Sequence, residues 1–265
     1  MKKRIISAII LLAIFIPVLI KGGMLFDIFA YIIAILALKE FLDIKNSKKE
    51  LPMFIQFISY IFITLIIFMN SSSDLLLSVD YRLMSGVFLT FLIPTVLYHD
   101  RRLYSINDAF YLIGGIFFLG ISFSLLILLR SVGLNILLYL LLIAIFTDTF
   151  AYFTGYFIGQ NKLLSDISPN KTVEGMIGGT IMGVFISTMF YHTVIDPQLP
   201  MYIIIFISLF LSIIGQFGDL VFSAIKRYFD KKDFSNLIPG HGGILDRLDS
   251  IIFIALGFMF FISLI

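Results

Sequence analysis

Four aspartates stand out because they lie within or beside long apolar stretches of the sequence. Asp148 and Asp219 fall inside apolar segments, and Asp246 and Asp249 fall at the start of the last one. An ionised carboxylate at the centre of a bilayer costs about 2.5–3.5 kcal/mol on insertion scales, so such side chains usually face a cavity or a partner. Asp246 and Asp249 are three residues apart and share one helix face. We expect all four carboxylates to line one polar cavity.

Asp219 begins a polar stripe at the end of an otherwise apolar segment. Ser223, Lys226 and Asp230 follow it at spacings of 4, 3 and 4 residues. These spacings place the four side chains along one face of a helix. An acid, a hydroxyl and an ammonium group would be poorly solvated in lipid, so we expect this stripe to line the same cavity.

The stretch between Ser223 and Asp249 combines glycines, basic residues and acids. Its Pro-Gly-His-Gly-Gly run at 239–243 breaks any helix and allows close approach of the backbone. The run leads into the next helix, whose first amides favour an anion. Lys226, Arg227 and Arg247 stand nearby in the sequence and suit phosphate, whereas carboxylates suit a hard cation. Since Mg²⁺ is held by one or two carboxylates plus substrate phosphates, this stretch predicts a Mg²⁺–nucleotide or Mg²⁺–pyrophosphate site.

A second polar segment follows the helix that carries Asp148. Ser168 and Pro169, with Thr172 and Glu174, are typical of a helix start, where Glu stabilises the positive helix end. That reading accounts for Thr172 and Glu174 as well as a functional one does. Lys171 lies where a phosphate would dock. For His241, a loop-organising contact and a substrate contact both stay open.

The composition indicates a membrane protein. The chain has 265 residues, of which 60% are hydrophobic and 14% charged, and its mean hydropathy is +1.05. A soluble domain carries about 25% charged residues, so too few polar side chains are present to coat a soluble globule. The chain contains no cysteine, which excludes disulfides and thiolate metal sites. A net charge of +2 is too small to suggest nucleic acid as a partner.

We predict an all-α polytopic membrane protein with about nine transmembrane helices. A bilayer core requires about 20 apolar residues per helix. The stretches that come close are 5–20, 24–38, 51–69, 83–98, 109–129, 134–158, 173–195, 200–225 and 244–265. The first is expected to be a retained helix rather than a cleaved signal peptide.

These helices are expected to form a single membrane domain over residues 1–265. Residues 1–130 would supply scaffold helices and dimer contacts, and residues 134–265 the catalytic helices. Gly175, Gly179 and Gly183 repeat every four residues, a spacing that favours close helix packing in lipid.

The distribution of basic residues predicts the orientation. With the N-terminus in the cytoplasm, every Lys and Arg except Lys21, Arg82 and Arg130 falls on the cytoplasmic side. Positive residues in short loops concentrate on that side of a membrane. We therefore expect the polar cavity to open to the cytoplasm, in a bacterial inner membrane.

Residues 223–249 closely resemble the signature of the phosphatidate cytidylyltransferases, also called CDP-diacylglycerol synthases. The matching pattern is Ser-x-Ile-Lys-Arg-x4-Lys-Asp-x-Ser-x2-Ile-Pro-x-His-Gly-Gly-Ile-x-Asp-Arg-Leu-Asp, without a gap. Asp148-Thr-Phe-Ala-Tyr and the run 168–175 resemble a second conserved region of that family. The resemblance implies transfer of a cytidylyl group from CTP to phosphatidate for phospholipid synthesis, with pyrophosphate released. It also implies a homodimer among the membrane lipids.

On this hypothesis the polar residues divide into two roles. Asp219 and Asp246 would be metal ligands, and Asp249 a third ligand or a partner of one. Because three close carboxylates repel one another, one or two cations are both open. The catalytic residues would then be Asp219, Lys226, Asp246 and Asp249. The substrate-binding residues would be Asp148, Ser168, Lys171, Thr172, Glu174, Ser223, Arg227, His241 and Arg247.

Two other functions remain as alternatives. A CTP-dependent lipid kinase would release CDP and phosphorylate a lipid alcohol. An ion-coupled secondary transporter also has buried carboxylates and glycine-broken helices, but its sites lie near the midplane between repeated halves. Here the polar residues crowd one side and one half of the chain, which favours the enzyme.

Overall fold

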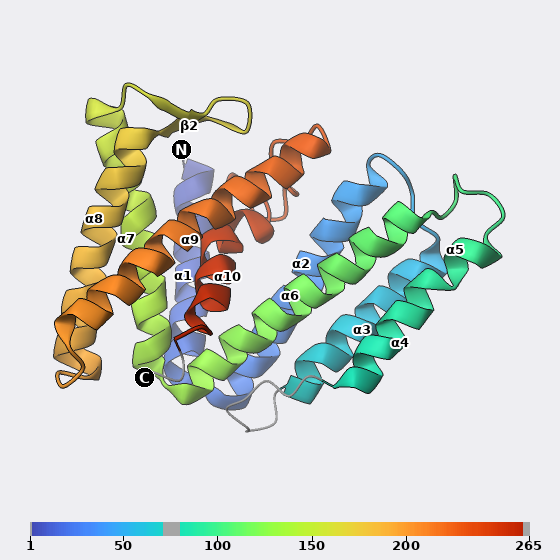
Figure 1. Cartoon of the computed structure of the whole chain (residues 1–265), viewed down its shortest axis with the longest axis horizontal. Helices are drawn as coiled ribbons and strands as arrows, with labels where there is room; N and C mark the ends of the chain where they lie inside the picture. The colour runs from blue at the N-terminus through green and yellow to red at the C-terminus, as the bar shows by residue number, and fades with distance from the viewer. Residues whose placement is uncertain (1, 71–79, 262–265) are drawn as a thin grey trace. The chain divides into compact units, whose positions relative to one another are not determined.

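The structure is a computed structural model that describes residues 2–70 and 80–261 (Figure 1). These residues are mostly helical, which confirms the expected class. Part of the connection after residue 70 and the end of the last expected helix, 262–265, lie outside the described residues. The helices before residue 133 are α1 (Lys2–Lys21), α2 (Gly23–Asn46), α3 (Met53–Asn70), α4 (Tyr81–Leu92), α5 (Pro94–Leu97) and α6 (Ile106–Val132). The later elements are α7 (Leu134–Ile158), β1 (Lys162–Leu164), β2 (Ser168–Thr172), α8 (Val173–Phe190), the π-helix η1 (Tyr191–Ile195), α9 (Met201–Tyr228) and α10 (Leu245–Phe258).

Within the described ranges, four helices are long and apolar enough to cross a membrane. They are α6, α7, α8 continued by η1, and α9. The apolar parts of α1, α3 and α4–α5 are shorter, with 10–17 residues each. The structure thus supports a multi-pass membrane protein, and the count of nine spans stays a prediction.

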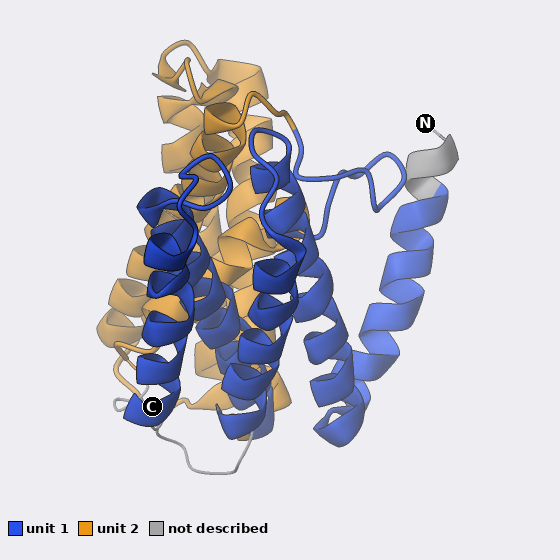
Figure 2. Ribbon diagram, turned by 90° about the vertical axis from the view of Figure 1, so that its right-hand side faces the viewer, with its two compact units in different colours: residues 1–131, 233–245 blue, residues 132–232, 246–265 orange. Residues whose placement is uncertain are grey.

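The chain divides into two compact units (Figure 2). Unit 1 comprises residues 1–131 and 233–245, and unit 2 comprises residues 132–232 and 246–265. The glycine-rich run 239–243 therefore groups with the N-terminal helices, although it was expected among the catalytic helices. The single membrane domain stays a prediction.

In unit 1, α2 is longer than the sequence pattern predicted. The polar stretch after Leu38 was expected to be a connection, but the helix continues to Asn46. The added turns contain Lys, Glu and Leu, which propagate a helix readily. They also carry Lys45, whose ammonium group pairs with the buried carboxylate of Asp108 at 2.6 Å. Lys49 pairs with the same carboxylate.

The segment predicted as one helix over 83–98 is two helices. α4 ends at Leu92 and α5 begins at Pro94. Proline has no amide hydrogen to donate and its ring clashes with the preceding turn, so it interrupts a helix at this point.

In unit 2, α7 and α8 pack closely along a stripe of glycines, as predicted. A methyl group on Gly175 would lie 2.7 Å from the carbonyl oxygen of Ala151, and one on Gly179 would lie 2.5 Å from that of Thr147. Only glycine allows the two backbones to approach this closely. Hydrogen bonds add to the packing against α9, because Thr147 on α7 contacts Ser212 at 2.8 Å.

The connection between α7 and α8 is an antiparallel β-hairpin of β1 and β2. The sequence predicted a helix start at Ser168, Pro169, Thr172 and Glu174, and α8 does begin here, at Val173, with Glu174 in its first turn. Ser168 and Pro169 instead lie in β2. Thr172 caps α8 by accepting a hydrogen bond from the amide of Gly175 at 3.1 Å. Leu164 pairs with Ser168 across the hairpin, which folds the polar connection back on itself.

Candidate active site

One cavity of about 670 Å³ lies in unit 2. Its walls come from the end of α7, the hairpin, the start of α8, the later part of α9 and the first turns of α10. Its size is that of ordinary small-molecule sites, about 300–1,000 Å³. The polar residues that line it are Asp148, Lys162, Asn170, Lys171, Thr172, Gln216, Asp219, Asp246, Arg247 and Asp249.

The four aspartates singled out in the sequence all line this cavity. Asp148 comes from α7, Asp219 from α9, and Asp246 and Asp249 from α10. These three helices of unit 2 are separated along the chain, and their aspartates meet at the cavity. The site therefore brings four carboxylates together in one cavity.

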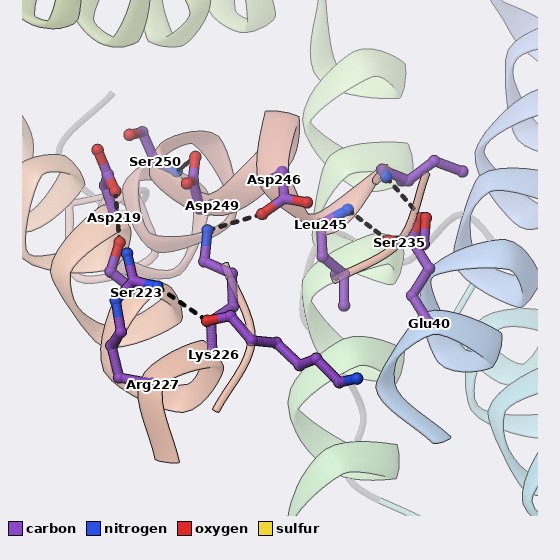
Figure 3. Close-up of polar contacts among 12 residues, drawn as sticks. Glu40, Asp219, Ser223, Lys226, Arg227, Ser235, Leu245, Asp246, Asp249 and Ser250 are labelled. Atoms are coloured by element: carbon purple, nitrogen blue, oxygen red, sulfur yellow. Dashed lines mark hydrogen bonds and ion pairs between the residues drawn. The ribbon is translucent and has the colours of Figure 1, made fainter. Parts of the chain in front are cut away.

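Lysines balance two of these carboxylates. The ammonium group of Lys171 lies 2.6 Å from Asp219 Oδ2, and that of Lys226 lies 2.6 Å from Asp246 Oδ1 (Figure 3 shows the second pair). The Lys226 side chain is only 10% exposed. A buried charge is tolerated when a partner of opposite sign is in contact, and each lysine meets that need for its aspartate.

Ser223 and Ser250 orient three of the carboxylates. Ser223 donates to Asp219 Oδ1 at 3.2 Å, and Ser250 donates through its hydroxyl to Asp148 Oδ2 at 3.3 Å. The amide of Ser250 also donates to Asp249 Oδ1 at 2.8 Å. Ser250 was not expected at the site, and its position beside the signature aspartates is the signal that could have identified it.

The donor types fit a hard divalent cation, but the described residues do not form a complete protein cage. Among them no group of three His, Cys, Asp or Glu side chains is arranged to hold a metal ion. Mg²⁺ does not require such a cage, because substrate phosphates and water supply most of its ligands. One or two of the carboxylates Asp219, Asp246 and Asp249 suffice, and their assignment as ligands stays a prediction.

The basic residues that line the cavity differ in part from those expected, because Lys226 and Arg227 do not line it. Lys171 and Arg247 line it as expected, and Lys162 on β1 joins them. Gln216 also lines it and donates to Thr180 at 2.8 Å. Lys162 and Gln216 were not among the predicted site residues. Their place at the cavity depends on how the chain folds around it, which no motif in the sequence indicates.

Several expected substrate contacts do not line the cavity. Glu174 accepts hydrogen bonds from the amides of Gln160 and Asn161, so it ties the end of α7 to the start of α8. Arg227 donates to the carbonyl oxygens of Ile167 and Lys231 at 3.3 and 2.9 Å. These contacts favour structural roles for both. The expected residues outside the cavity lining are Ser168, Glu174, Ser223, Lys226, Arg227 and His241.

His241 lies in a tight turn of unit 1. The amide of His241 donates to Ile238 at 2.9 Å, and the amide of Ile238 donates to Gly242 at 2.9 Å. Gly240 and Gly242 have φ angles of 80° and 81°, where side chains are strained, so the turn requires glycine at both positions. Nδ1 of His241 lies 2.9 Å from the hydroxyl of Ser7 on α1, a loop-organising contact.

The sequence predicted that the first amides of α10 would bind an anion, and in the structure they bind the carboxylate of Glu40. The carboxylate of Glu40, on α2, accepts hydrogen bonds from the amides of Ile244 and Leu245 at 2.8 and 2.9 Å. These amides were expected to be open to a phosphate. Glu40 lies about 200 residues away in sequence and in a segment predicted to be a connection, so no local pattern pointed to it.

Comparison with known proteins identifies relatives over nearly the whole chain. The model of the family described as "Cytidylyltransferase family" matches residues 2–265. A protein of Staphylococcus saprophyticus named "Phosphatidate cytidylyltransferase" is 38% identical over 255 residues, 96% of each chain. Proteins of the same name from Staphylococcus aureus and Staphylococcus epidermidis are 38% and 37% identical, again over 96% of each chain.

Proposed function

Since this chain belongs to the cytidylyltransferase family, we propose that it transfers the cytidylyl group of CTP to phosphatidate, giving CDP-diacylglycerol and pyrophosphate. The observation that carries this proposal is the cavity in which four aspartates meet Lys162, Lys171 and Arg247 among apolar helices. Such a site can accept two phosphate-bearing substrates, one of them a lipid.

In this reaction a phosphate oxygen of phosphatidate attacks the α-phosphorus of CTP. The new P–O bond forms as the bond from the α-phosphorus to the pyrophosphate oxygen breaks, and pyrophosphate leaves in line. The nucleophile is already an anion, so no general base has to remove a proton. Catalysis of this kind depends on positioning and on neutralising charge. Lys171 and Arg247 are placed to neutralise phosphate oxygens, and Lys226 holds Asp246 in place.

We further propose that the reaction requires Mg²⁺, with Asp219 and Asp246 as ligands and Asp249 as a third ligand or a neighbour of one. When bound, the cation neutralises phosphate oxygens as negative charge shifts to the leaving pyrophosphate. The proposal is supported by the donor types at the cavity and leaves the number of cations at one or two.

Removal of divalent ions tests this assignment. We expect dialysis against a chelator to abolish turnover and added Mg²⁺ to restore it, because the phosphates would otherwise repel the aspartates. Normal turnover after exhaustive chelation would exclude a metal role for these aspartates.

We also propose that the N-terminus and the cavity face the cytoplasm, that nine helices span the membrane, and that the protein is a homodimer. The distribution of Lys and Arg supports the orientation. The cavity lining includes the end of α7 and the starts of α8 and α10, which supports a common side for these parts of the chain.

Product analysis tests the function directly. Purified protein is incubated with CTP labelled at the α-phosphorus, phosphatidate and Mg²⁺. We expect the label to enter a lipid, with one pyrophosphate released for each CDP-diacylglycerol formed. In a parallel incubation a lipid alcohol replaces phosphatidate, and labelled CDP formed there without labelled lipid would indicate the CTP-dependent kinase. Absence of CTP turnover with either lipid would overturn the enzymatic proposal.

A further inference from the structure

Glu40 is a buried acid on a helix that carries none of the expected site residues. It is 3% exposed and lies in unit 1, near the C-terminal end of α2. A buried carboxylate is costly unless hydrogen bonds satisfy it, so its partners indicate its role.

Three hydrogen-bond donors to the Glu40 carboxylate lie in the segment that leads into α10. Oε1 accepts from the hydroxyl of Ser235 at 2.6 Å and from the amide of Ile244 at 2.8 Å. Oε2 accepts from the amide of Leu245 at 2.9 Å (Figure 3). Both carboxylate oxygens are thus used, and two of the donors are amides at the first turn of a helix, which lack partners within that helix.

Gly243, next to Ile244 in the chain, leaves room for the Glu40 carboxylate. A methyl group on Gly243 would lie 2.5 Å from Glu40 Oε1, so a larger residue would push the carboxylate away from the amides. The hydroxyl of Ser7 adds a second anchor to the same segment by donating to the carbonyl oxygen of Pro239 at 3.0 Å.

We propose that Glu40 is a positioning residue of the active site. It holds the backbone at Ile244 and Leu245, and the next residue in the chain is Asp246, which lines the cavity and pairs with Lys226. A displacement of about 1 Å at a reacting group can cost about a hundredfold in rate. The effect on turnover rests on the proposed function, whereas the effect on the backbone does not.

The first test compares Glu40→Gln with Asp43→Asn, the same change of carboxylate to amide at an exposed position one turn along α2. Glutamine keeps the size of the side chain but can accept hydrogen bonds through one oxygen only. In Glu40→Gln we expect hydrogen exchange at the amides of Ile244 and Leu245 to be about tenfold faster, because a hydrogen bond to a charged acceptor is lost. Exchange in α7 and α8 should be unchanged.

Turnover separates positioning from simple stabilisation. We expect kcat of Glu40→Gln to fall about tenfold to a hundredfold with KM for CTP unchanged, since the lost alignment matters in the transition state. Its thermal unfolding in detergent should stay close to wild type, and Asp43→Asn should match wild type in every measurement.

Gly243→Ala supplies an independent variant should Glu40→Gln fold poorly. Gly243 does not have a positive φ, so alanine perturbs the site mainly through the contact with Glu40. We expect the same pattern of faster exchange and lower kcat. The double variant should lose no more than the worse single variant, because both changes break one interaction.

Three outcomes would overturn the proposal. Wild-type kcat in Glu40→Gln, whether or not exchange increases, would leave Glu40 without a role in turnover. Additive losses in the double variant would show that Gly243 acts elsewhere. Unchanged hydrogen exchange at the amides of Ile244 and Leu245 would show that Glu40 does not stabilise these amides. Should wild-type protein make no CDP-diacylglycerol, the proposed function fails, and the exchange data still report on the contact.

Discussion

At the scale of single residues, two of the four aspartates at the site form ion pairs with lysines. Asp246 illustrates this, because its carboxylate lines the cavity and also accepts a hydrogen bond from the buried ammonium group of Lys226 at 2.6 Å. The ion pair with Lys226 fixes the direction of the Asp246 side chain. On the proposed metal assignment, the same carboxylate would also bind the cation.

Asp246→Asn is expected to abolish turnover, with a loss of more than about a hundredfold, while the protein still inserts and folds. The amide oxygen of asparagine can accept the hydrogen bond from Lys226, but the neutral side chain binds a divalent cation weakly. Initial rates and thermal unfolding of the purified variant check this. Asp43→Asn is the matched control, and wild-type turnover in Asp246→Asn would remove the metal assignment.

Lys171 is the basic residue for which the structure makes the clearest prediction. It lines the cavity and its ammonium group lies 2.6 Å from Asp219. Lys171→Gln should lower kcat/KM by about tenfold to a hundredfold, because a charge-assisted hydrogen bond to phosphate contributes about 1.5–3 kcal/mol. Lys48→Gln, an exposed lysine that does not line the cavity, should leave kcat/KM unchanged. Equal rates for both variants would contradict a phosphate-binding role.

At the scale of elements, the glycine stripe of α8 positions the wall that carries Asp148. At Gly179 an added methyl group would lie 2.5 Å from the carbonyl oxygen of Thr147, the residue before Asp148. A side chain at this position would separate α7 from α8 and would shift Asp148 with it.

Gly179→Ala should therefore lower the Tm, with a loss of stability of about 1–3 kcal/mol from overpacking. Gly114→Ala is the control, because a methyl group on Gly114 meets no atom within 4 Å and alanine favours a helix. Thermal unfolding of both variants in the same detergent is the measurement. A Tm for Gly179→Ala at or above that of Gly114→Ala would show that the helices can separate without cost.

At the scale of the whole molecule, the distribution of basic residues predicts which connections face the cytoplasm. The chain has no cysteine, so a thiol reagent would label only a cysteine introduced by mutation, and its labelling shows on which side of the membrane that position lies. Glu50 and Gln198 are both exposed and lie in connections predicted to face opposite sides.

A membrane-impermeant thiol reagent applied to intact bacteria should label the Gln198→Cys variant. It should label the Glu50→Cys variant only after the membrane is permeabilised, because short loops rich in Lys and Arg stay in the cytoplasm. Labelling with the opposite pattern would invert the proposed topology and would place the cavity on the outer side.

Much of this protein follows from sequence alone, where the physical signal is local. The segments predicted at 134–158 and 173–195 match α7 and α8 with η1, because hydropathy and the preference for helix in lipid act over one turn at a time. The four aspartates could be assigned to one cavity, since a carboxylate in an apolar segment needs a polar neighbour wherever the chain goes.

The tertiary structure alone decided which groups meet. Lys171 pairs with Asp219 and Lys226 with Asp246, and the carboxylate of Glu40 reaches the amides of Ile244 and Leu245. No spacing in the sequence encodes such contacts, because they depend on how helices far apart in the chain are brought together. For the same reason the backbone partners of Glu174 and Arg227, both predicted as substrate contacts, could not be inferred from the sequence. Sequence determines which charges must be satisfied in lipid, and packing determines the partner that satisfies each of them.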